Sequence, residues 1–198
     1  MCSVYEFGKG NKKPPKELKA DGFGSLGDAV GLIRRTDKAP VYVSDGSVRM
    51  MRWGYERAGL GVVNNTRSEN LDSPMWRESV NRRRCLIPVT AFYEWSGPRG
   101  NKRTHRFSSP ADEWLWMAGI WEEADDLGAC FSMITTSANA LMAPIHHRMP
   151  AVLTGEQLNP FLDGDLREFN PSADTLAVDE ARNPLLKNPP SHIQDELF

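Results

Sequence analysis

Short apolar runs separated by turn-forming residues are the main pattern of the chain, and they favour β-strands over long helices. Apolar positions at residues 41–43 and 48–53 flank the turn Ser44-Asp45-Gly46, a spacing that predicts a β-hairpin. Such runs predict further strands at residues 85–89, 91–95, 114–121, 129–135 and 176–178. The short spacing between these runs favours antiparallel pairs of neighbouring strands.

Helical spacing is confined to short segments. Residues 25–33 carry apolar positions on one helical face and predict a first short helix. Pro74, which follows a serine suited to capping, fits the first position of a second short helix. Residues 154–162 predict a third, with Thr154 as its N-cap. All three are too short to form a helical bundle, so we expect them outside a strand-built core.

Polar segments predict the loops, and none of them divides the chain into domains. Residues 8–22 are rich in Lys, Gly and Pro, and residues 64–70 are polar without periodicity, so both are expected to be loops. Residues 135–142 fit a strand end, a cap and one or two helical turns. We therefore expect one α+β domain over residues 1–198, with mostly antiparallel strands curled around a core, short peripheral helices, and a weakly structured tail from about residue 180.

Composition excludes several classes of protein. The chain has 198 residues, of which 40% are hydrophobic and 25% charged, as expected of a soluble globular protein. Its apolar runs are shorter than the about 18 residues of a membrane span, and no secretory signal is visible. Three cysteines and four histidines show no metal-binding spacing, and no nucleotide-binding loop is present. We therefore expect a cytoplasmic protein with no metal, cofactor or structural disulfide.

The net charge of −2 hides a strong local asymmetry. Residues 77–106 hold eight Lys or Arg and two acids, a net charge of +6, whereas residues 107–126 hold six acids and no Lys or Arg. One interpretation is a pair of solvated faces that compensate each other. The other is a basic groove that follows a phosphate backbone, with aromatic side chains that stack on single-stranded bases.

The first two residues, Met1 and Cys2, offer the most distinctive chemistry. Removal of Met1 leaves an α-amine, with a reference pKa of about 7.7–8.0, beside a thiol with a reference pKa of about 8.5. Such a 1,2-aminothiol condenses with an aldehyde to an imine, and its thiol then closes a five-membered thiazolidine. By position alone, Cys2 is better explained as the second residue of a frayed terminus with no role, so the chemical interpretation depends on the rest of the chain.

Two other polar residues stand out from their surroundings. Glu94 interrupts the run Phe-Tyr-Glu-Trp, where it either faces solvent from a strand or is half-buried, with a raised pKa suited to acid–base catalysis. His146 and His147 are adjacent, and neighbouring residues of a strand point in opposite directions, so at most one of them serves a site. A lone histidine is more often structural than catalytic.

Four separated motifs occur together and in a fixed order. They are Met-Cys at the start, Asn-Thr-Arg-Ser-Glu at residues 65–69, Phe-Tyr-Glu-Trp at 92–95 and Ile-His-His-Arg-Met-Pro at 145–150. In this combination the chain resembles the SOS response-associated peptidase family, also called SRAP or the abasic-site-processing domain. The Trp-Gly-Tyr triplet at residues 53–55 adds to the resemblance.

The resemblance implies a sensor and shield of abasic sites in single-stranded DNA. Members remove their own Met1 and then form a covalent thiazolidine crosslink to the abasic site through Cys2, so the implied activities are autopeptidase and AP-lyase-like. It also implies a DNA-associated monomer with no membrane partner. The implied catalytic residues are Cys2, Asn65, Glu94 and His146. The residues implied to contact DNA are Arg67, Thr135, Arg148 and Trp53.

The chain also departs from the family pattern. Ser3 and Val4 replace the usual Gly-Arg, and residues 56–60 lack the bulky residues that wedge against bases in other members. Two other functions therefore remain open. One is a cysteine peptidase that acts on other polypeptides through Cys2 or Cys85, and the other is a single-stranded DNA binding module without catalysis.

Overall fold

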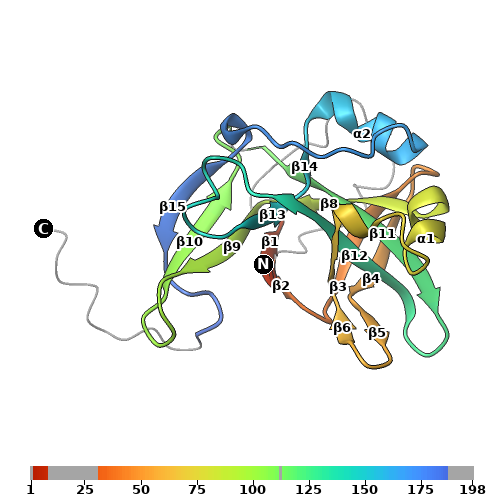
Figure 1. Cartoon of the computed structure of the whole chain (residues 1–198), viewed down its shortest axis with the longest axis horizontal. Helices are drawn as coiled ribbons and strands as arrows, with labels where there is room; N and C mark the ends of the chain where they lie inside the picture. The colour runs from red at the N-terminus through yellow and green to blue at the C-terminus, as the bar shows by residue number, and fades with distance from the viewer. Residues whose placement is uncertain (1, 9–30, 112, 187–198) are drawn as a thin grey trace, which may run out of the picture.

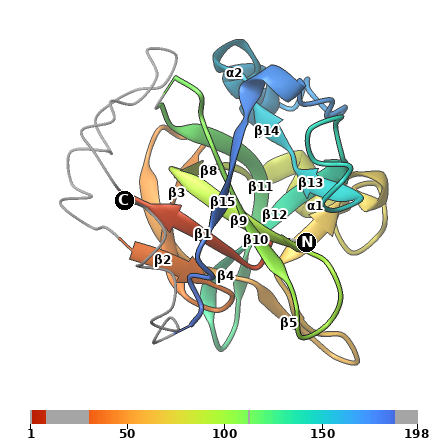
Figure 2. The same cartoon turned by 90° about the vertical axis from the view of Figure 1, so that its left-hand side faces the viewer.

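The computed structural model describes residues 2–8, 31–111 and 113–186, and most of its strands belong to two sheets (Figures 1 and 2). The smaller sheet has five antiparallel strands, and Figure 2 looks onto it. Its order is β15 (Ala177–Ala181), β10 (Arg103–Ser108), β9 (Ala91–Ser96), β1 (Val4–Phe7) and β2 (Gly31–Arg34).

The larger sheet closes on itself. Its order is β13 (Arg148–Pro150), β12 (Gly128–Ser137), β4 (Val48–Trp53), β3 (Lys38–Val43), β8 (Arg84–Val89), β11 (Leu115–Ala124) and β14 (Val152–Leu153). Because β11 pairs with β12 as well as with β8, the path from β12 through β4, β3 and β8 returns to β12 as a small barrel. The strand β7 (Asn65–Arg67) adds to β12 in parallel.

Burial alternates along the barrel strands because successive side chains point to opposite faces. On β8, Cys85 and Ile87 belong to a buried cluster inside the barrel, whereas Leu86 belongs to a second cluster beneath the helices. Both faces are therefore covered, which explains why these strands appear in the sequence as continuous apolar runs. Gly119 of β11 is required where the interior is tightest, since a Cβ there would lie 2.9 Å from the Cys85 sulfur.

Two short helices cover the barrel. They are α1 (Arg77–Arg82) and α2 (Gly155–Asp163). Thr154 caps α2, and its backbone N–H donates to Gln157 Oε1 over 3.0 Å. None of the described helices is long and apolar enough to cross a membrane.

The structure confirms most predicted strands and the mainly antiparallel α+β fold. The predicted hairpin is β3–β4, the strands predicted at residues 85–89, 91–95, 114–121 and 129–135 are β8, β9, β11 and β12, and the one at 176–178 is β15. The helix predicted at residues 154–162 is α2. That residues 1–198 form one domain stays a prediction.

Other predictions need correction. Residues 31–34 form β2 rather than the end of a helix, while residues 25–30 and 9–22 lie outside the described residues. The second helix begins at Arg77 with Trp76 as its N-cap, later than the expected start at Pro74. After β12, Asn139 Oδ1 accepts a hydrogen bond from the Met142 N–H over 3.0 Å, but turns follow instead of a helix.

The segment 64–70, expected to be a loop, forms β7 and a 3₁₀ turn at Ser68–Asn70. Thr66 points inward and its hydroxyl lies 2.8 Å from that of Ser132, which satisfies a polar residue inside the sheet. Parallel pairing with β12 supplies hydrogen-bond partners for the backbone of β7. The polar sequence gives no indication of this pairing.

The basic window at residues 77–106 does not form one groove. Its residues divide between α1 with the start of β8 and the β9–β10 hairpin, which lie at opposite ends of the molecule (Figure 1). Arg84 is buried and donates to the carbonyls of Val80, Phe161 and Leu166 over 2.7–2.9 Å. Arg106 is paired with Glu6. The structure therefore agrees better with charged faces that compensate each other than with a single basic groove.

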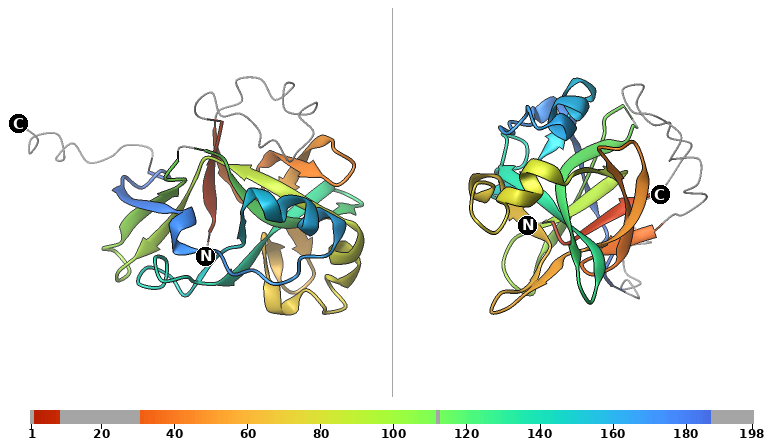
Figure 3. Two further views of the ribbon diagram at one scale, coloured as in Figure 1. Left: turned by 90° about the horizontal axis from the view of Figure 1, so that it is seen from above. Right: turned by 90° about the vertical axis from the view of Figure 1, so that its right-hand side faces the viewer.

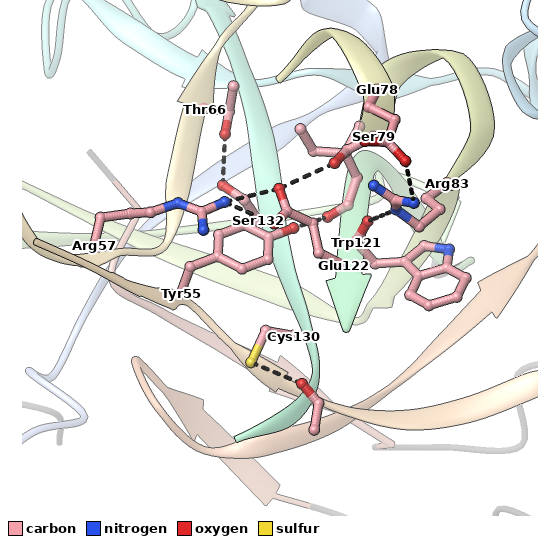
Figure 4. Close-up of polar contacts among 12 residues, drawn as sticks. Tyr55, Arg57, Thr66, Glu78, Ser79, Arg83, Trp121, Glu122, Cys130 and Ser132 are labelled. Carbon is pink, nitrogen blue, oxygen red and sulfur yellow. Dashed lines mark hydrogen bonds and ion pairs between the residues drawn. The ribbon is translucent and has the colours of Figure 1, made fainter. Parts of the chain in front are cut away.

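A polar network fixes the hairpin formed by β5 (Tyr55–Arg57) and β6 (Gly61–Val63) against the barrel (Figure 4). Arg57 Nη2 donates to both carboxylate oxygens of Glu122 over 2.8 and 2.7 Å, and Ser79 on α1 donates to the same carboxylate. The Arg57 guanidinium lies 5.0 Å from the ring centre of Tyr55 and 5.5 Å from that of Trp76. The hairpin that precedes β7 is therefore held against the barrel near its turn, where Arg57 pairs with Gly61.

We expect Arg57→Ala to lower the free energy of unfolding by about 2–3 kcal/mol, because the half-buried Glu122 loses its cationic partner. Chemical denaturation followed by tryptophan fluorescence measures the change. The matched control is Arg167→Ala, which removes an exposed pair with Asp72 and should cost less than about 1 kcal/mol. Equal costs for the two variants would show that the network adds no stability.

Candidate functional site

Cys2 lies two residues before β1, the strand of the five-stranded sheet that runs beside the barrel in Figure 3. Its side chain is fully buried in the cluster that contains Cys85 and Ile87 of the barrel and Phe92 of the five-stranded sheet. Its main-chain carbonyl accepts a 2.8 Å hydrogen bond from Asn65 Nδ2 and a longer one, 3.5 Å, from Asn64 Nδ2. Asn64 and Asn65 therefore hold the main chain of Cys2 in place through its carbonyl group.

Glu94 reaches the same place from β9. Tyr5 pairs with Phe92, and extending this antiparallel register towards the N-terminus places Ser3 opposite Glu94. Glu94 is 2% exposed, and burial raises the pKa of its carboxyl. Burial also raises the pKa of the Cys2 thiol, and the negative charge of Glu94 raises it further. The thiol and the carboxyl are therefore close enough to influence each other.

Hydrogen bonds to the preceding residue, Asn64, hold Asn65 in place. The carbonyl of Asn64 accepts hydrogen bonds from the Trp53 indole N–H over 2.8 Å and from the Met133 N–H over 3.0 Å. While Asn65 Nδ2 donates to Cys2, Asn65 Oδ1 is buried and accepts no hydrogen bond within the described part of the chain. A buried acceptor of this kind is costly unless a donor reaches it. Asn65 Oδ1 is therefore able to accept an N–H or O–H group beside Cys2.

His146 lies in the turn that leads from β12 into β13. Its Nδ1 lies 3.0 Å from the backbone nitrogen of Arg148 and 3.1 Å from the Arg148 carbonyl oxygen, and its ring stacks on His147 with 4.5 Å between ring centres. Burial lowers the pKa of His146, which favours the neutral imidazole. Of the two histidines, His146 is half-buried and His147 is exposed.

Arg67 is exposed at the end of β7. Asn65 and Arg67 are two positions apart on one strand, so they share a face, while Thr66 points inward. Within the described residues, the guanidinium of Arg67 forms no hydrogen bond or ion pair. It is therefore available to an anionic ligand beside Asn65.

Thr135 and Arg148, two of the residues expected at DNA, lie beneath the surface. The Thr135 side chain is buried, and its hydroxyl donates to the Thr66 carbonyl over 3.4 Å. The Arg148 side chain is 8% exposed and donates to Glu69 through Nη1 and Nη2 over 2.5 and 2.9 Å. The Arg148 guanidinium holds the pKa of Glu69 down to about 2. This packing leaves neither side chain the open surface that contact with a phosphate needs.

Trp53 corrects the expectation that it contacts DNA. It is fully buried on β4, where it packs edge-on against Tyr5 with ring centres 5.0 Å apart and stacks on Phe131. Its N–H is committed to the Asn64 carbonyl. Trp53 therefore supports the Asn64–Asn65 segment from inside the barrel and presents no surface to a nucleic acid.

Sequence reasoning missed Asn64 and Glu69 as members of this region. The doublet Asn64-Asn65 was a visible signal for the first, since both side chains donate to one carbonyl. Glu69 belongs to the motif at residues 65–69, but the sequence analysis assigned it no role. Cys85, the other candidate nucleophile, is fully buried on β8, and burial raises the pKa of its thiol as it does that of Cys2. Among the described residues, no cluster of His, Cys, Asp or Glu could hold a metal ion.

Comparisons with known proteins agree with one another. The sequence model of a family described as "SOS response associated peptidase (SRAP)" matches residues 28–186. The abasic site processing protein YoqW of Bacillus subtilis (strain 168) is 33% identical over 139 residues, which cover 61% of this chain and 61% of that protein. The abasic site processing protein HMCES of Pongo abelii is 34% identical over 156 residues, which cover 58% of this chain and 44% of that protein. The chain thus spans less than two thirds of the length of these curated relatives.

Solved structures share the fold. A crystal structure of a protein from Bacteroides thetaiotaomicron has a TM-score of 0.74 at 21% identity and covers 92% of this chain and 93% of that one. The crystal structure of a phage-related protein from Bordetella bronchiseptica has a TM-score of 0.68 at 19% identity and covers 92% of this chain and 95% of that one. The curled, strand-rich architecture is therefore shared with proteins of low sequence identity.

Proposed function

Because the chain belongs to the SOS response-associated peptidase (SRAP) family, we propose that it processes abasic sites in single-stranded DNA by forming a covalent bond through Cys2. The observation that carries the proposal is the convergence on Cys2 of two groups from distant segments. Asn65 Nδ2 donates to the Cys2 carbonyl over 2.8 Å, and Glu94 lies beside the thiol. The amine and the thiol of Cys2 are the groups that condense with an aldehyde to a thiazolidine, and Asn65 and Glu94 lie beside them to orient the amine and to transfer protons.

The first step is hydrolysis of the Met1–Cys2 peptide bond, in which water supplies a hydroxyl to Met1 and a proton to the new Cys2 amine. Glu94 moves the protons, since its raised pKa lets it hold a proton closer to neutral pH than an ordinary glutamate. The buried Asn65 Oδ1 accepts an N–H from the freed amine, which satisfies both the acceptor and the donor.

The second step is capture of the lesion. The Cys2 amine attacks the aldehyde carbon of the open-chain deoxyribose, and the resulting carbinolamine loses water to give an imine. The thiol then adds to the imine carbon, so that a C–S bond forms and the thiol proton passes to nitrogen. Because burial keeps the Cys2 thiol protonated at neutral pH, the amine acts before the thiol. His146 exchanges a proton with the sugar and so promotes ring opening or reversal.

The test is a denaturing gel of the purified chain with a single-stranded oligonucleotide that carries one abasic site, beside the intact mass of the protein. We expect a slower band that survives denaturation and a protein mass without Met1. An undamaged oligonucleotide of the same sequence should give no such band. Binding without a covalent product, from protein that has lost Met1, would instead support the non-catalytic DNA binding module.

The cysteine peptidase alternative makes a different prediction, namely turnover of added peptides without a covalent DNA product. Asn65 and Glu94 lie beside Cys2, whereas Cys85 lies on β8, so Cys2 is the better placed of the two nucleophiles it could use. Single-stranded DNA as the partner, a monomeric state and a cytoplasmic location stay predictions.

Arg67 is proposed to bind a DNA phosphate next to the lesion. We expect Arg67→Ala to weaken binding of single-stranded DNA about tenfold at low salt, because one charge-assisted contact is lost. The slope of log K against log salt should fall by about 0.7. Fluorescence anisotropy over a salt series measures both. Arg82→Ala, at an exposed position on α1, is the matched control, and an equal loss in that variant would contradict a specific contact.

A further inference from the structure

Positive charge without partners gathers at the end of the β9–β10 hairpin. Half of the eight basic residues at 77–106 have hydrogen-bond or ion-pair partners, namely Arg77, Arg83, Arg84 and Arg106. The other half are exposed and have no such partner in the part of the chain that the structure describes, and they are Arg82, Arg99, Lys102 and Arg103. All of these except Arg82 lie on the hairpin, so its end holds most of the uncompensated charge of this window.

The strand register places Arg103 on the face of the five-stranded sheet that carries Glu94. Glu94 of β9 pairs with His105 of β10, and Arg103 lies two positions from His105, so the three side chains share one face. Further along the same two strands, Phe92 pairs with Phe107, and their rings stack in the core with 4.9 Å between ring centres. The face therefore leads from the buried core past Glu94 to the exposed Arg103.

The turn of the hairpin is built to hold this basic end in place. Gly97 has a φ of 89°, and a Cβ there would lie 2.9 Å from the Asn101 carbonyl oxygen. The Asn101 N–H donates to the Pro98 carbonyl over 3.1 Å, which closes the turn. Burial raises the pKa of Glu94, and the positive charge of Lys102 is one of the influences that lower it. Lys102 therefore lies close enough to the site for its charge to act on Glu94.

Arg67 and Arg103 approach Cys2 from different sheets. Arg67 lies two positions from Asn65 on β7, which belongs to the larger sheet, whereas Arg103 shares its face with Glu94 in the five-stranded sheet. Asn65 and Glu94 both lie beside Cys2. Both arginines are exposed, and neither has a hydrogen-bond or ion-pair partner among the described residues. An anionic chain that passes Cys2 therefore meets one available guanidinium on each sheet.

We propose that Arg103, with Lys102 beside it, forms a second phosphate-binding site, which holds the DNA strand on the side of the abasic nucleotide opposite to Arg67. This inference rests on the proposed function, which supplies single-stranded DNA as the ligand. A guanidinium suits a phosphate because it can donate two parallel hydrogen bonds to it. Glu180 of the edge strand β15 pairs with His105 from the other side of β10, and its negative charge directs the DNA towards the β9 side of the face.

Holding the strand on both sides of the lesion serves the reaction. A single nucleotide without a base offers no ring to stack, so the phosphates on either side are the groups by which the deoxyribose can be positioned. Two fixed contacts restrict the motion of the aldehyde carbon relative to the Cys2 amine, which lowers the entropic cost of the attack. The second phosphate-binding site is therefore expected to affect both affinity and the rate of crosslinking.

The test is fluorescence anisotropy with single-stranded oligonucleotides that carry tetrahydrofuran, an abasic analogue that has no aldehyde and forms no covalent bond. With the analogue at the centre, Arg103→Ala should weaken binding about tenfold at low salt, because a charge-assisted contact is lost. The slope of log K against log salt should fall by about 0.7. Arg103→Lys keeps the charge but not the paired donors, so it should retain the slope and lose part of the affinity.

Oligonucleotides with the analogue at one end separate the two phosphate sites. When DNA extends from only one side of the analogue, either Arg103→Ala or Arg67→Ala should bind as wild type does, and the opposite end should reverse the two variants. Arg82→Ala, at an exposed position on α1 without a described partner, is the matched control and should match wild type with all three oligonucleotides. Sensitivity of both variants to the same end, or a loss in Arg103→Ala no larger than in Arg82→Ala, would overturn the inference.

Failure of the proposed function would give a different result. Wild-type protein that shows this binding pattern with tetrahydrofuran, but no denaturation-resistant product with a true abasic site, would contradict covalent capture and leave the second phosphate-binding site in place. The converse result is a wild-type protein that crosslinks, together with an Arg103→Ala variant that binds and crosslinks equally well. That result would refute the second phosphate-binding site alone.

Discussion

Cys2→Ser should lower the yield of denaturation-resistant crosslink by at least about 100-fold while leaving DNA binding intact. A hydroxyl oxygen is a much weaker nucleophile than sulfur, so the variant stops at the imine, which hydrolyses back to the amine and the aldehyde. The α-amine of the substituted residue remains able to attack. Treatment with borohydride should therefore reduce the imine to a stable amine and restore a covalent band, which assigns the two steps to two groups of one residue.

The experiment needs two controls. Intact mass must show that the variant has lost Met1, because an acylated nitrogen cannot form an imine. Cys130→Ser replaces another buried cysteine, whose sulfur lies 3.4 Å from the Gly128 carbonyl on β12, and should crosslink as wild type does. Equal yields of heat-stable product from wild type and Cys2→Ser would refute the thiazolidine. No band even with borohydride would refute attack by the amine.

The sequence predicted those parts of the fold whose signals are local. Alternating apolar positions and a turn of Ser44-Asp45-Gly46 predict β3–β4, and they require no knowledge of the rest of the chain. The β7 segment could not be predicted in this way, because a polar strand of three residues forms only where β12 offers it backbone partners. Closure of the barrel through β11 and β12 could not be predicted either, because strand order depends on contacts between residues that are far apart in the sequence.

The candidate site, too, could be predicted from the sequence only in part. The motif resemblance identified Cys2 and Glu94, which the structure brings together. Resemblance could not reveal how Trp53 and Arg148 are packed, because their environments depend on residues outside their motifs. The partner of Arg148 is Glu69, 79 positions away, and the sequence shows only one charge of each sign in two separate motifs. The two arginines differ in burial, which residue type does not reveal, since Arg67 is exposed and the Arg148 side chain is 8% exposed.

Glu94→Gln is expected to slow crosslinking about 10²- to 10⁴-fold, the range of general acid–base catalysis. The amide has nearly the shape of the carboxyl but can neither give up nor take a proton. Glutamine in this 2% exposed position therefore removes proton transfer with little change in packing. The affinity of the variant for an undamaged oligonucleotide is expected to stay the same. It should be measured beside the crosslinking rates as a reference. Glu123→Gln, an exposed position on β11, is the matched control and should react at the wild-type rate.

The pH profile makes this prediction specific to Glu94. Burial raises the pKa of its carboxyl, so the protonated form that expels water from the carbinolamine persists closer to neutral pH and is lost as the pH rises through that raised pKa. The Cys2 amine acts in the opposite direction, because it gains reactivity as it loses its proton near its reference pKa of about 7.7–8.0. Wild type should thus show a bell-shaped profile. Glu94→Gln should retain only the ascending limb, whereas a bell of unchanged shape in the variant would assign the acid to another group.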